Sequence, residues 1–150
     1  MDRTVYDIYN LLQEIAWHFG NHGFDGDCCE DLSLVEFMAL KKACENKCFS
    51  IQEIGNALGF TKSGATRIID RLESKGYARR ERSPVDGRVC CVTVTDKGEL
   101  VISRVTGQYT AYLEGMLRDL ELQRIKSIRD ALGTMAELIQ RQEFMQPEGE

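Results

Sequence analysis

A cluster of cations lies in the middle of a sequence that is otherwise acidic. The 150 residues carry a formal net charge of −5. Residues 61–88 hold eight lysine and arginine side chains against four acidic ones, so this segment carries +4 and the remainder carries −9. Hydroxyl groups lie among these cations, and guanidinium and hydroxyl groups are the partners that phosphates and base edges require. The segment favours a surface that binds a polyanion, with an ordinary solvated charged face as the alternative.

Residues 61–75 are expected to form a helix that presents this chemistry on one side. Thr61 can cap its start, and Gly76 can end it. The apolar residues fall within one arc of the helical wheel: Ala65, Ile68, Ile69 and Leu72. The opposite half is polar: Lys62, Ser63, Thr66, Arg67, Asp70, Arg71 and Ser74. The helix N-terminus adds backbone N–H donors for a phosphate, and Asp70 is expected to pair with a nearby arginine.

Two short strands are expected directly after this helix, at residues 77–83 and 88–95. The turn Pro84-Val85-Asp86-Gly87 between them predicts a hairpin. The arginines around the turn are Arg79, Arg80, Arg82 and Arg88. A basic hairpin beside a recognition helix can follow the DNA backbone or enter the minor groove. Asp86 can hydrogen-bond the Arg88 guanidinium and direct it.

Helices account for most of the remaining sequence. Apolar residues at steps of three and four predict helices at 4–20 and about 121–142, and another helix begins at Asp96. Ser33 and Ser50 are each followed three residues later by glutamate, the spacing of a capping box that opens a helix. The resulting order is that of a winged helix-turn-helix. The predicted fold class is mainly α with a small β-hairpin wing, and with long N- and C-terminal helices for dimerisation.

Residues from about 50 to 98 resemble the DNA-binding core of MarR-type transcriptional regulators. The stretches that carry the resemblance are Ile54-Gly55-Asn56-Ala57-Leu58-Gly59, Thr66-Arg67-Ile68-Ile69-Asp70-Arg71-Leu72-Glu73-Ser74-Lys75-Gly76, Arg79-Arg80, Asp86-Gly87-Arg88 and Val94-Thr95-Asp96-Lys97-Gly98. The resemblance implies a winged-helix homodimer whose terminal helices form the dimer interface. It also implies recognition contacts at residues 61–67 and wing contacts at Asp86 and Arg88. Ser63-Gly64 stands where many relatives have proline.

We expect a single domain over residues 1–150, with a DNA-binding lobe at 32–98 and a dimerisation region at 4–20 and 99–142. The predicted DNA contacts are Thr61, Lys62, Ser63, Ala65, Thr66, Arg67, Arg71, Arg82, Asp86 and Arg88. The predicted function is a transcriptional regulator, a repressor that binds a pseudo-palindromic double-stranded DNA operator as a homodimer and is released by a signal. The N-terminus has no signal-peptide pattern, so we expect a cytoplasmic protein without membrane contact. No catalytic motif indicates an enzyme, and no cofactor is expected.

The sequence leaves open which signal would release the protein from DNA. Candidate lining residues for a small-molecule effector pocket are Tyr6, Tyr9, Trp17 and Phe37, with core packing as the alternative. The six cysteines are expected to be free thiols. Residues of the types that bind zinc or similar metals lie close in sequence at His18, His22, Cys28 and Cys29, although they match neither C-x-x-C spacing nor the later histidines that zinc-sensing relatives use. A thiol- or metal-responsive sensor of the same fold, a winged-helix protein-interaction module and a thiol-dependent enzyme remain alternatives.

Overall fold

The computed structural model describes residues 2–22 and 31–145, and within them the chain forms six helices and two strands. Their order is α1 (Arg3–His22), α2 (Leu34–Glu45), α3 (Ile51–Leu58), α4 (Lys62–Ser74), β1 (Ala78–Arg82), β2 (Cys90–Val94), α5 (Asp96–Leu117) and α6 (Leu122–Met145). The predicted class, mainly α with one hairpin wing, is confirmed. The chain separates into two compact units, Met1–Thr106 and Gly107–Glu150, and α5 runs across the boundary between them.

Both predicted capping boxes are present and explain where α2 and α3 begin. The Ser33 hydroxyl accepts a hydrogen bond from the Glu36 backbone N–H at 3.2 Å, and Glu36 accepts one from the Ser33 N–H at 3.1 Å. Ser50 and Glu53 repeat this exchange at 3.1 and 2.8 Å. Each box satisfies donors that the first helical turn leaves without partners, which fixes the start of the helix.

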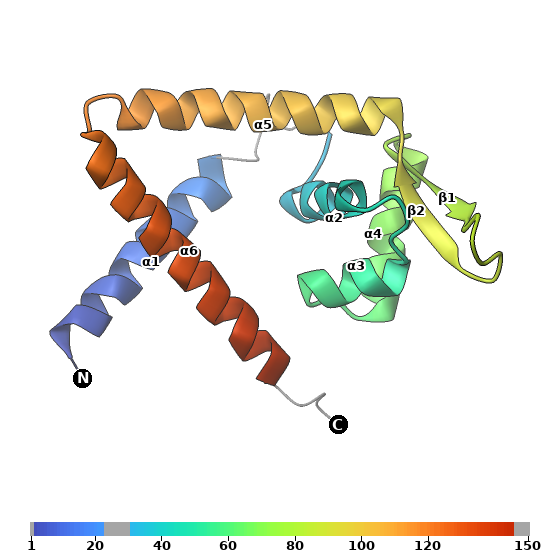
Figure 1. Ribbon diagram of the computed structural model, residues 1–150, viewed down its shortest axis with the longest axis horizontal. Helices are drawn as coiled ribbons and strands as arrows, with labels where there is room; N and C mark the ends of the chain where they lie inside the picture. The colour runs from blue at the N-terminus through green and yellow to red at the C-terminus, as the bar shows by residue number, and fades with distance from the viewer. Residues whose placement is uncertain (1, 23–30, 146–150) are drawn as a thin grey trace. The chain divides into compact units, whose positions relative to one another are not determined.

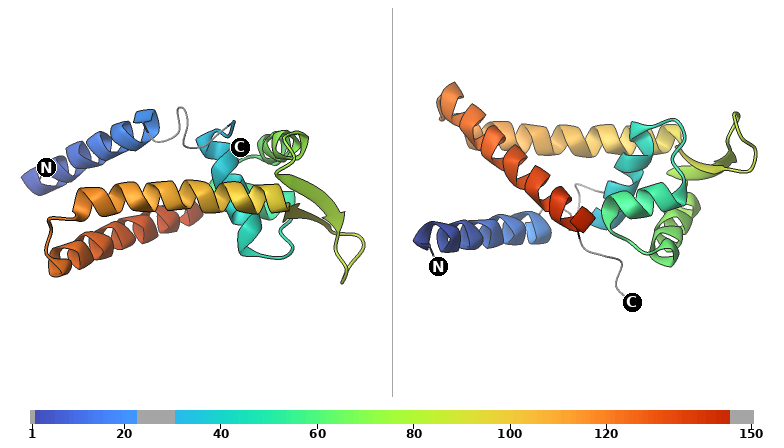
Figure 2. Two further views of the ribbon diagram at one scale, coloured as in Figure 1. Left: turned by 90° about the horizontal axis from the view of Figure 1, so that it is seen from above. Right: turned by 60° about the horizontal axis from the view of Figure 1, so that its bottom comes forward.

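A winged-helix lobe is formed by α2, α3, α4 and the hairpin, which contact one another (Figure 1). The predicted inner arc of α4 lies in its core, since Ala65, Ile68, Ile69 and Leu72 are all at most 5% exposed. Leu40 from α2, Ile54 from α3 and Val92 from β2 are among the other buried apolar residues. In both views of Figure 2 the turn of the hairpin projects away from these helices. The lobe therefore leaves the polar face of α4 and the hairpin turn outside its core.

Two glycines shape the turn between α3 and α4, for different reasons. Gly59 has φ of +71°, in the left-handed region where a side chain is strained, and its N–H caps α3. Gly55 allows the two helices to approach closely, because a Cβ placed there would lie 3.0 Å from the Ala65 Cβ. Close packing therefore explains the glycine at position 55. For Gly59 the reason is the backbone conformation.

A third segment of the chain pairs with the two strands of the hairpin. β1 and β2 pair antiparallel, with Arg80 opposite Val92, and Phe49 in the connector between α2 and α3 bridges Val92 on its other side. The Val92 N–H donates to the Phe49 carbonyl at 2.7 Å. This bridge joins the wing to the base of the helix-turn-helix.

The expectation that all six cysteines are free thiols is wrong for two of them. Cys48, beside Phe49, forms a disulfide with Cys91 of β2. Because α2 ends at Glu45, Cys44 and Cys48 do not share a helix, so their spacing of four residues does not place them on one helix face. Cys44 and Cys90 are free and exposed. Cys28 and Cys29 lie outside the described residues.

The terminal helices expose large apolar side chains in the single chain. On α1 the exposed set is Val5, Tyr6, Ile8, Tyr9, Leu11, Leu12, Ile15 and Trp17. On α6 it is Leu122, Ile128, Leu132, Leu138 and Ile139. Within the described part of the chain, no helix combines the length and apolar character that crossing a membrane requires.

Candidate nucleic-acid interface

The N-terminal end of α4 carries five of the predicted DNA contacts on one open surface. Thr61 caps the helix, and its hydroxyl accepts a hydrogen bond from the Gly64 N–H at 3.1 Å. An open hollow of about 700 Å³ follows this end of the helix and is lined by Thr61, Lys62, Ser63, Thr66 and Arg67. Ala65 lies apart from them, because it is 1% exposed and its side chain meets Gly55 in the core.

The hydroxyl groups at this end of α4 already take part in hydrogen bonds within the protein. The Thr66 hydroxyl donates to the Lys62 carbonyl at 2.9 Å, and the Ser63 and Thr61 hydroxyls lie 3.3 Å apart. Because the Thr66 proton is used inside the helix, this side chain offers a partner its oxygen as an acceptor. Acceptors of this kind suit the amino groups of adenine and cytosine in the major groove.

Four of the eight cations in residues 61–88 are paired with acidic side chains inside the lobe. Glu36 of α2, which is 3% exposed, pairs with the Arg71 Nε at 2.9 Å and the Lys75 Nζ at 2.7 Å. Arg80 contacts both Asp70 and Glu73 of α4, which confirms the expected pairing of Asp70 with an arginine. Arg79 pairs with Glu81 on its own strand. The pairs made by Glu36 and Arg80 hold α4 against α2 and β1.

The other four cations have no acidic partner among the residues that the structure describes: Lys62, Arg67, Arg82 and Arg88. The first two lie at the start of α4, and the last two flank the turn of the hairpin. The positive charge that is open to a polyanion is therefore concentrated at the helix N-terminus and the wing. Arg71, also a predicted DNA contact, has its Nε engaged by Glu36 while its side chain stays 54% exposed.

The wing turn is built by Asp86 acting on the backbone. Its carboxylate accepts a hydrogen bond from the Arg88 N–H at 3.1 Å, and its carbonyl accepts one from the Val89 N–H at 3.0 Å. Among the described contacts Asp86 meets the backbone of Arg88, and not the guanidinium as expected. Such a turn fixes the backbone at Arg88. Val85 at the tip is 95% exposed, so the turn presents one apolar side chain beside the arginine.

A polar network anchors the C-terminal end of α4. The Tyr77 hydroxyl donates to the Asp31 carboxylate at 2.6 Å, and Lys75 donates to the Asp31 carbonyl. Burial and this hydrogen bond raise the pKa of Tyr77 to about 12, and the same bond holds the pKa of Asp31 below its usual value. Lys97 lies over the Tyr77 ring at 4.5 Å from its centroid. This end of the helix is therefore tied into the lobe.

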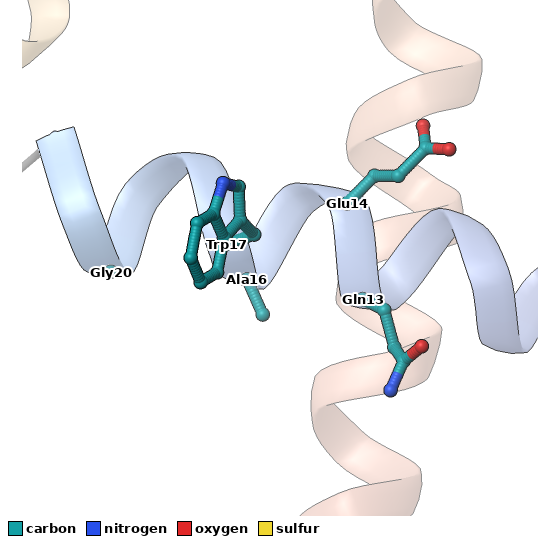
Figure 3. Close-up of a pocket in the computed structure, with 5 residues that line it drawn as sticks. All are labelled: Gln13, Glu14, Ala16, Trp17 and Gly20. Carbon is teal, nitrogen blue, oxygen red and sulfur yellow. The ribbon is translucent and has the colours of Figure 1, made fainter.

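The predicted effector-pocket residues fall in different environments. Phe37 is 6% exposed and belongs to the core of the lobe. Tyr6, Tyr9 and Trp17 are exposed on α1, Trp17 to 71%. The Trp17 ring stands out from α1 at an open hollow that Gln13, Glu14, Ala16 and Gly20 also line (Figure 3). Among the described residues of its own unit, this indole is therefore mostly uncovered.

The residues considered for metal binding are only partly described. His18 lies on α1 with its ring edge-on to Phe19 at 5.2 Å. The side chain of His22, together with Cys28 and Cys29, lies outside what is described. In residues 2–22 and 31–145, no three histidine, cysteine, aspartate or glutamate side chains gather in a way that could hold a metal ion.

Comparison with known proteins finds similar sequences in one family of regulators. The MarR family model matches residues 32–90, which cover the lobe from before α2 to the start of β2. PapX, an HTH-type transcriptional regulator of Escherichia coli, is 34% identical over 118 residues, which are 79% of this chain and 66% of PapX. The chain is similar to the transcriptional regulators of the MarR family. It spans slightly less than two thirds of the length of PapX.

Solved structures agree with this MarR fold. A MarR family protein from Bacillus stearothermophilus superposes with a TM-score of 0.82 at 23% identity, over 93% of this chain and 99% of that one. FabT from Streptococcus pneumoniae, solved in complex with DNA, has a TM-score of 0.66 at 21% identity, over 92% of this chain and 94% of FabT. At these identities the likeness shows the winged-helix fold.

Two features of this winged-helix lobe could not be predicted from the sequence patterns. Glu36 was expected only to cap α2, and its pairing with Arg71 and Lys75 joins residues 35 and 39 positions apart that no local pattern connects. The Cys48–Cys91 disulfide spans 43 positions and follows from the Phe49–Val92 bridge. A charged residue at a capping position that later proves buried leaves no sign in the sequence.

Proposed function

We propose that this chain is a DNA-binding transcriptional regulator that acts as a homodimer on a pseudo-palindromic operator. The observation that carries the proposal is the partition of cations: Lys62, Arg67, Arg82 and Arg88 are free of acidic partners in the described structure. The N-terminal half of α4 enters a major groove, which is wide enough for a helix. The β1–β2 turn contacts the neighbouring backbone or minor groove.

The chemistry of α4 assigns different tasks to its exposed residues. Lys62 and Arg67 neutralise phosphates or reach guanine edges, while the hydroxyls of Ser63 and Thr66 face the bases. The free N–H groups of the first helical turn add a further site for phosphate. Arg82 and Arg88 supply contacts from the wing that depend little on sequence. The match of residues 32–90 to the MarR family model supports this interpretation, and FabT, which shares the fold, has been solved with DNA.

The exposed apolar side chains of α1 and α6 support a homodimer. A monomer would leave more than a dozen large apolar side chains on these helices in water, including Tyr9, Trp17 and Leu132. A second copy of the chain would cover them, and a two-fold axis would present two α4 helices to successive major grooves. The half-sites would then be inverted and centred about one helical turn, or roughly 10 base pairs, apart.

The regulator is further proposed to be a cytoplasmic repressor whose DNA binding is released by a signal. A small-molecule effector is one such signal, and the exposed aromatic residues Tyr6, Tyr9 and Trp17 are the candidates that an effector would contact. A signal acts by favouring a dimer whose recognition helices no longer match the groove spacing. No catalytic step is part of this function.

The proposal is tested by selecting binders from a pool of random duplexes with the full-length chain. The expected product is an enriched inverted repeat, bound by two copies of the chain in sedimentation analysis. The free chain is expected to sediment as a dimer at micromolar concentration. A stable monomer that still binds the selected duplex would overturn the dimeric architecture, and failure to enrich any duplex would overturn DNA binding.

A protein-interaction module is the alternative that the same experiment addresses. An exposed apolar recognition face would favour it, but the exposed side of α4 consists of hydroxyl and charged groups. Equal retention of shuffled and selected duplexes, with no dependence on salt, would point to such a module.

A further inference from the structure

The Cys48–Cys91 disulfide joins two segments of the lobe that face different parts of the proposed DNA site. Cys48 lies in the connector before α3, and Cys91 lies in β2 of the wing. Their Cα atoms are 4.8 Å apart, inside the range of roughly 4.4–6.8 Å that disulfides occupy. The adjacent Phe49–Val92 bridge keeps the two backbones together independently of the bond. This bridge would therefore keep the two cysteines close to each other when the bond is reduced.

The crosslink closes a ring around all the proposed DNA-contacting elements. The two cysteines are 43 positions apart, and the segment between them contains α3, α4, β1 and the wing turn. In the described structure, the backbones of the connector and the wing pair at one bridge, between Phe49 and Val92. The disulfide is a second, covalent link between the same two segments. The disulfide thus fastens the strand that carries the wing to the base of the helix-turn-helix.

The two sulfurs differ in accessibility. Cys48 is exposed, whereas Cys91 is 2% exposed and packed in the lobe. A reagent from solution therefore reaches the Cys48 sulfur first, and Cys91 acts from inside. Thiol–disulfide exchange requires that an attacking thiolate can reach one of the two sulfurs, and the exposed Cys48 residue meets this requirement.

We propose that Cys48 and Cys91 form a reversible thiol–disulfide pair that sets how firmly the wing is held and thereby tunes DNA affinity. This inference rests on the proposed function. Its reductant is a dithiol and its oxidant is a hydroperoxide. Disulfides in reducing compartments are more often redox-active than structural.

The atoms and electrons balance in both the reduction and the oxidation of the Cys48–Cys91 pair. In reduction, a thiolate of the dithiol attacks the Cys48 sulfur, and the Cys91 sulfur leaves with the electron pair and takes up a proton. The second thiol then displaces Cys48 and closes the oxidised dithiol. In oxidation, the Cys48 thiolate takes the terminal oxygen of the hydroperoxide, whose O–O bond breaks to release an alcohol, or water when the oxidant is hydrogen peroxide. The Cys91 thiol then attacks the resulting sulfenic acid, and water leaves.

The oxidised form is the tighter binder. DNA binding requires the wing and α4 to be placed together, and a crosslink that removes freedom from the wing before binding lowers the entropy cost of the complex. We expect the oxidised chain to bind the selected duplex about fivefold more tightly than the reduced chain. We also expect a melting temperature higher by roughly 10 °C, because the bond constrains a long loop of the unfolded chain.

The test compares the full-length chain after hydrogen peroxide and after dithiothreitol. Peptide mapping without reduction identifies the Cys48–Cys91 bond, and melting and duplex affinity are measured in both states. Cys48→Ser, at an exposed position, is expected to remove both differences. The matched control Cys44→Ser/Cys90→Ser, which changes the two exposed free cysteines, is expected to keep them.

The outcomes separate this inference from the proposed function. If the bond maps and melting shifts but both states bind the duplex equally, DNA binding stands and the inference is wrong. If neither state binds any duplex, the proposed function fails and the inference falls with it. Absence of the mapped bond after peroxide, or a response that persists in Cys48→Ser, also overturns the inference.

Discussion

The two ends of α4 carry similar side chains in opposite states. At the C-terminal end, Arg71 and Lys75 are held by the buried Glu36, and Arg80 of the wing strand is held by Asp70 and Glu73. At the N-terminal end, Lys62 and Arg67 have no acidic partner in the described structure. One end fixes the helix in the lobe, and the other offers its charge outward. Net charge alone does not distinguish them.

The largest expected effect is on the free cations. Arg67→Ala and Arg88→Ala should each weaken binding to the selected duplex by about 30- to 100-fold at low salt, because each substitution removes two cations from the DNA surface of a dimer. Arg67→Ala should also relax sequence preference, whereas Arg88→Ala should weaken binding to all duplexes alike. Fluorescence anisotropy against selected and shuffled duplexes measures both effects. Unchanged affinity in either variant would contradict the assignment of that residue.

Glu36→Gln probes the opposite end of the helix. Removal of the buried carboxylate charge leaves Arg71 and Lys75 without their partner, so the free energy of unfolding should fall by about 2 kcal/mol. Urea denaturation measures this change. The matched control is Glu53→Gln, which alters the same capping interaction in α3. If both variants are destabilised equally, the cap and not the ion pairs explains the role of Glu36.

The Tyr77→Phe variant tests whether the polar network at the C-terminal end of α4 contributes to stability and not to DNA binding. The raised pKa of Tyr77, about 12, means that its contribution to stability is complete below about pH 10 and is lost as the pH rises through about 12. The variant loses the hydrogen bond to Asp31, so its free energy of unfolding at pH 7 should be lower by about 1 kcal/mol. Its stability should not show the decline at alkaline pH that ionisation of Tyr77 causes. Its duplex affinity at pH 7 should match that of the wild type. A steep alkaline decline that survives in the variant would refute the assignment.

The smallest effect is expected for single hydroxyls. Thr66→Ala should change duplex affinity by about threefold and alter the preferred base at one position of each half-site, because its oxygen is an acceptor on the proposed base-facing turn. Ser74→Ala is a close control, since that hydroxyl also donates to a backbone carbonyl of α4 but near its C-terminal end. A repeated selection with each variant should change the motif only for Thr66→Ala.

Local patterns predict the elements of this fold well. Ser33 and Ser50 cap the helices they were expected to cap, Gly76 follows α4 with a left-handed φ of +79°, and the arc from Ala65 to Leu72 is buried. Each of these follows from interactions within a few residues or from helical periodicity. The family resemblance at residues 50–98 is also confirmed by the match at residues 32–90.

Interactions between distant elements were not predictable in the same way. Glu36 reaches Arg71 only because α2 and α4 pack together, and Cys48 reaches Cys91 only because the connector pairs with β2. Asp86 was expected to direct the Arg88 guanidinium, whereas its carboxylate accepts a hydrogen bond from the Arg88 backbone. Such partners depend on tertiary packing and on local turn geometry, so spacing alone does not reveal which cations are free.

The salt dependence of duplex binding tests the partition of cations most directly. Removal of one cation that neutralises a phosphate should reduce the slope of log affinity against log salt by about one unit. Arg88→Ala should therefore flatten the slope by about one unit per protomer, while Arg80→Ala, which removes a cation already paired with Asp70 and Glu73, should leave the slope unchanged. Equal slopes for wild type and Arg88→Ala, or equal flattening in both variants, would contradict the account.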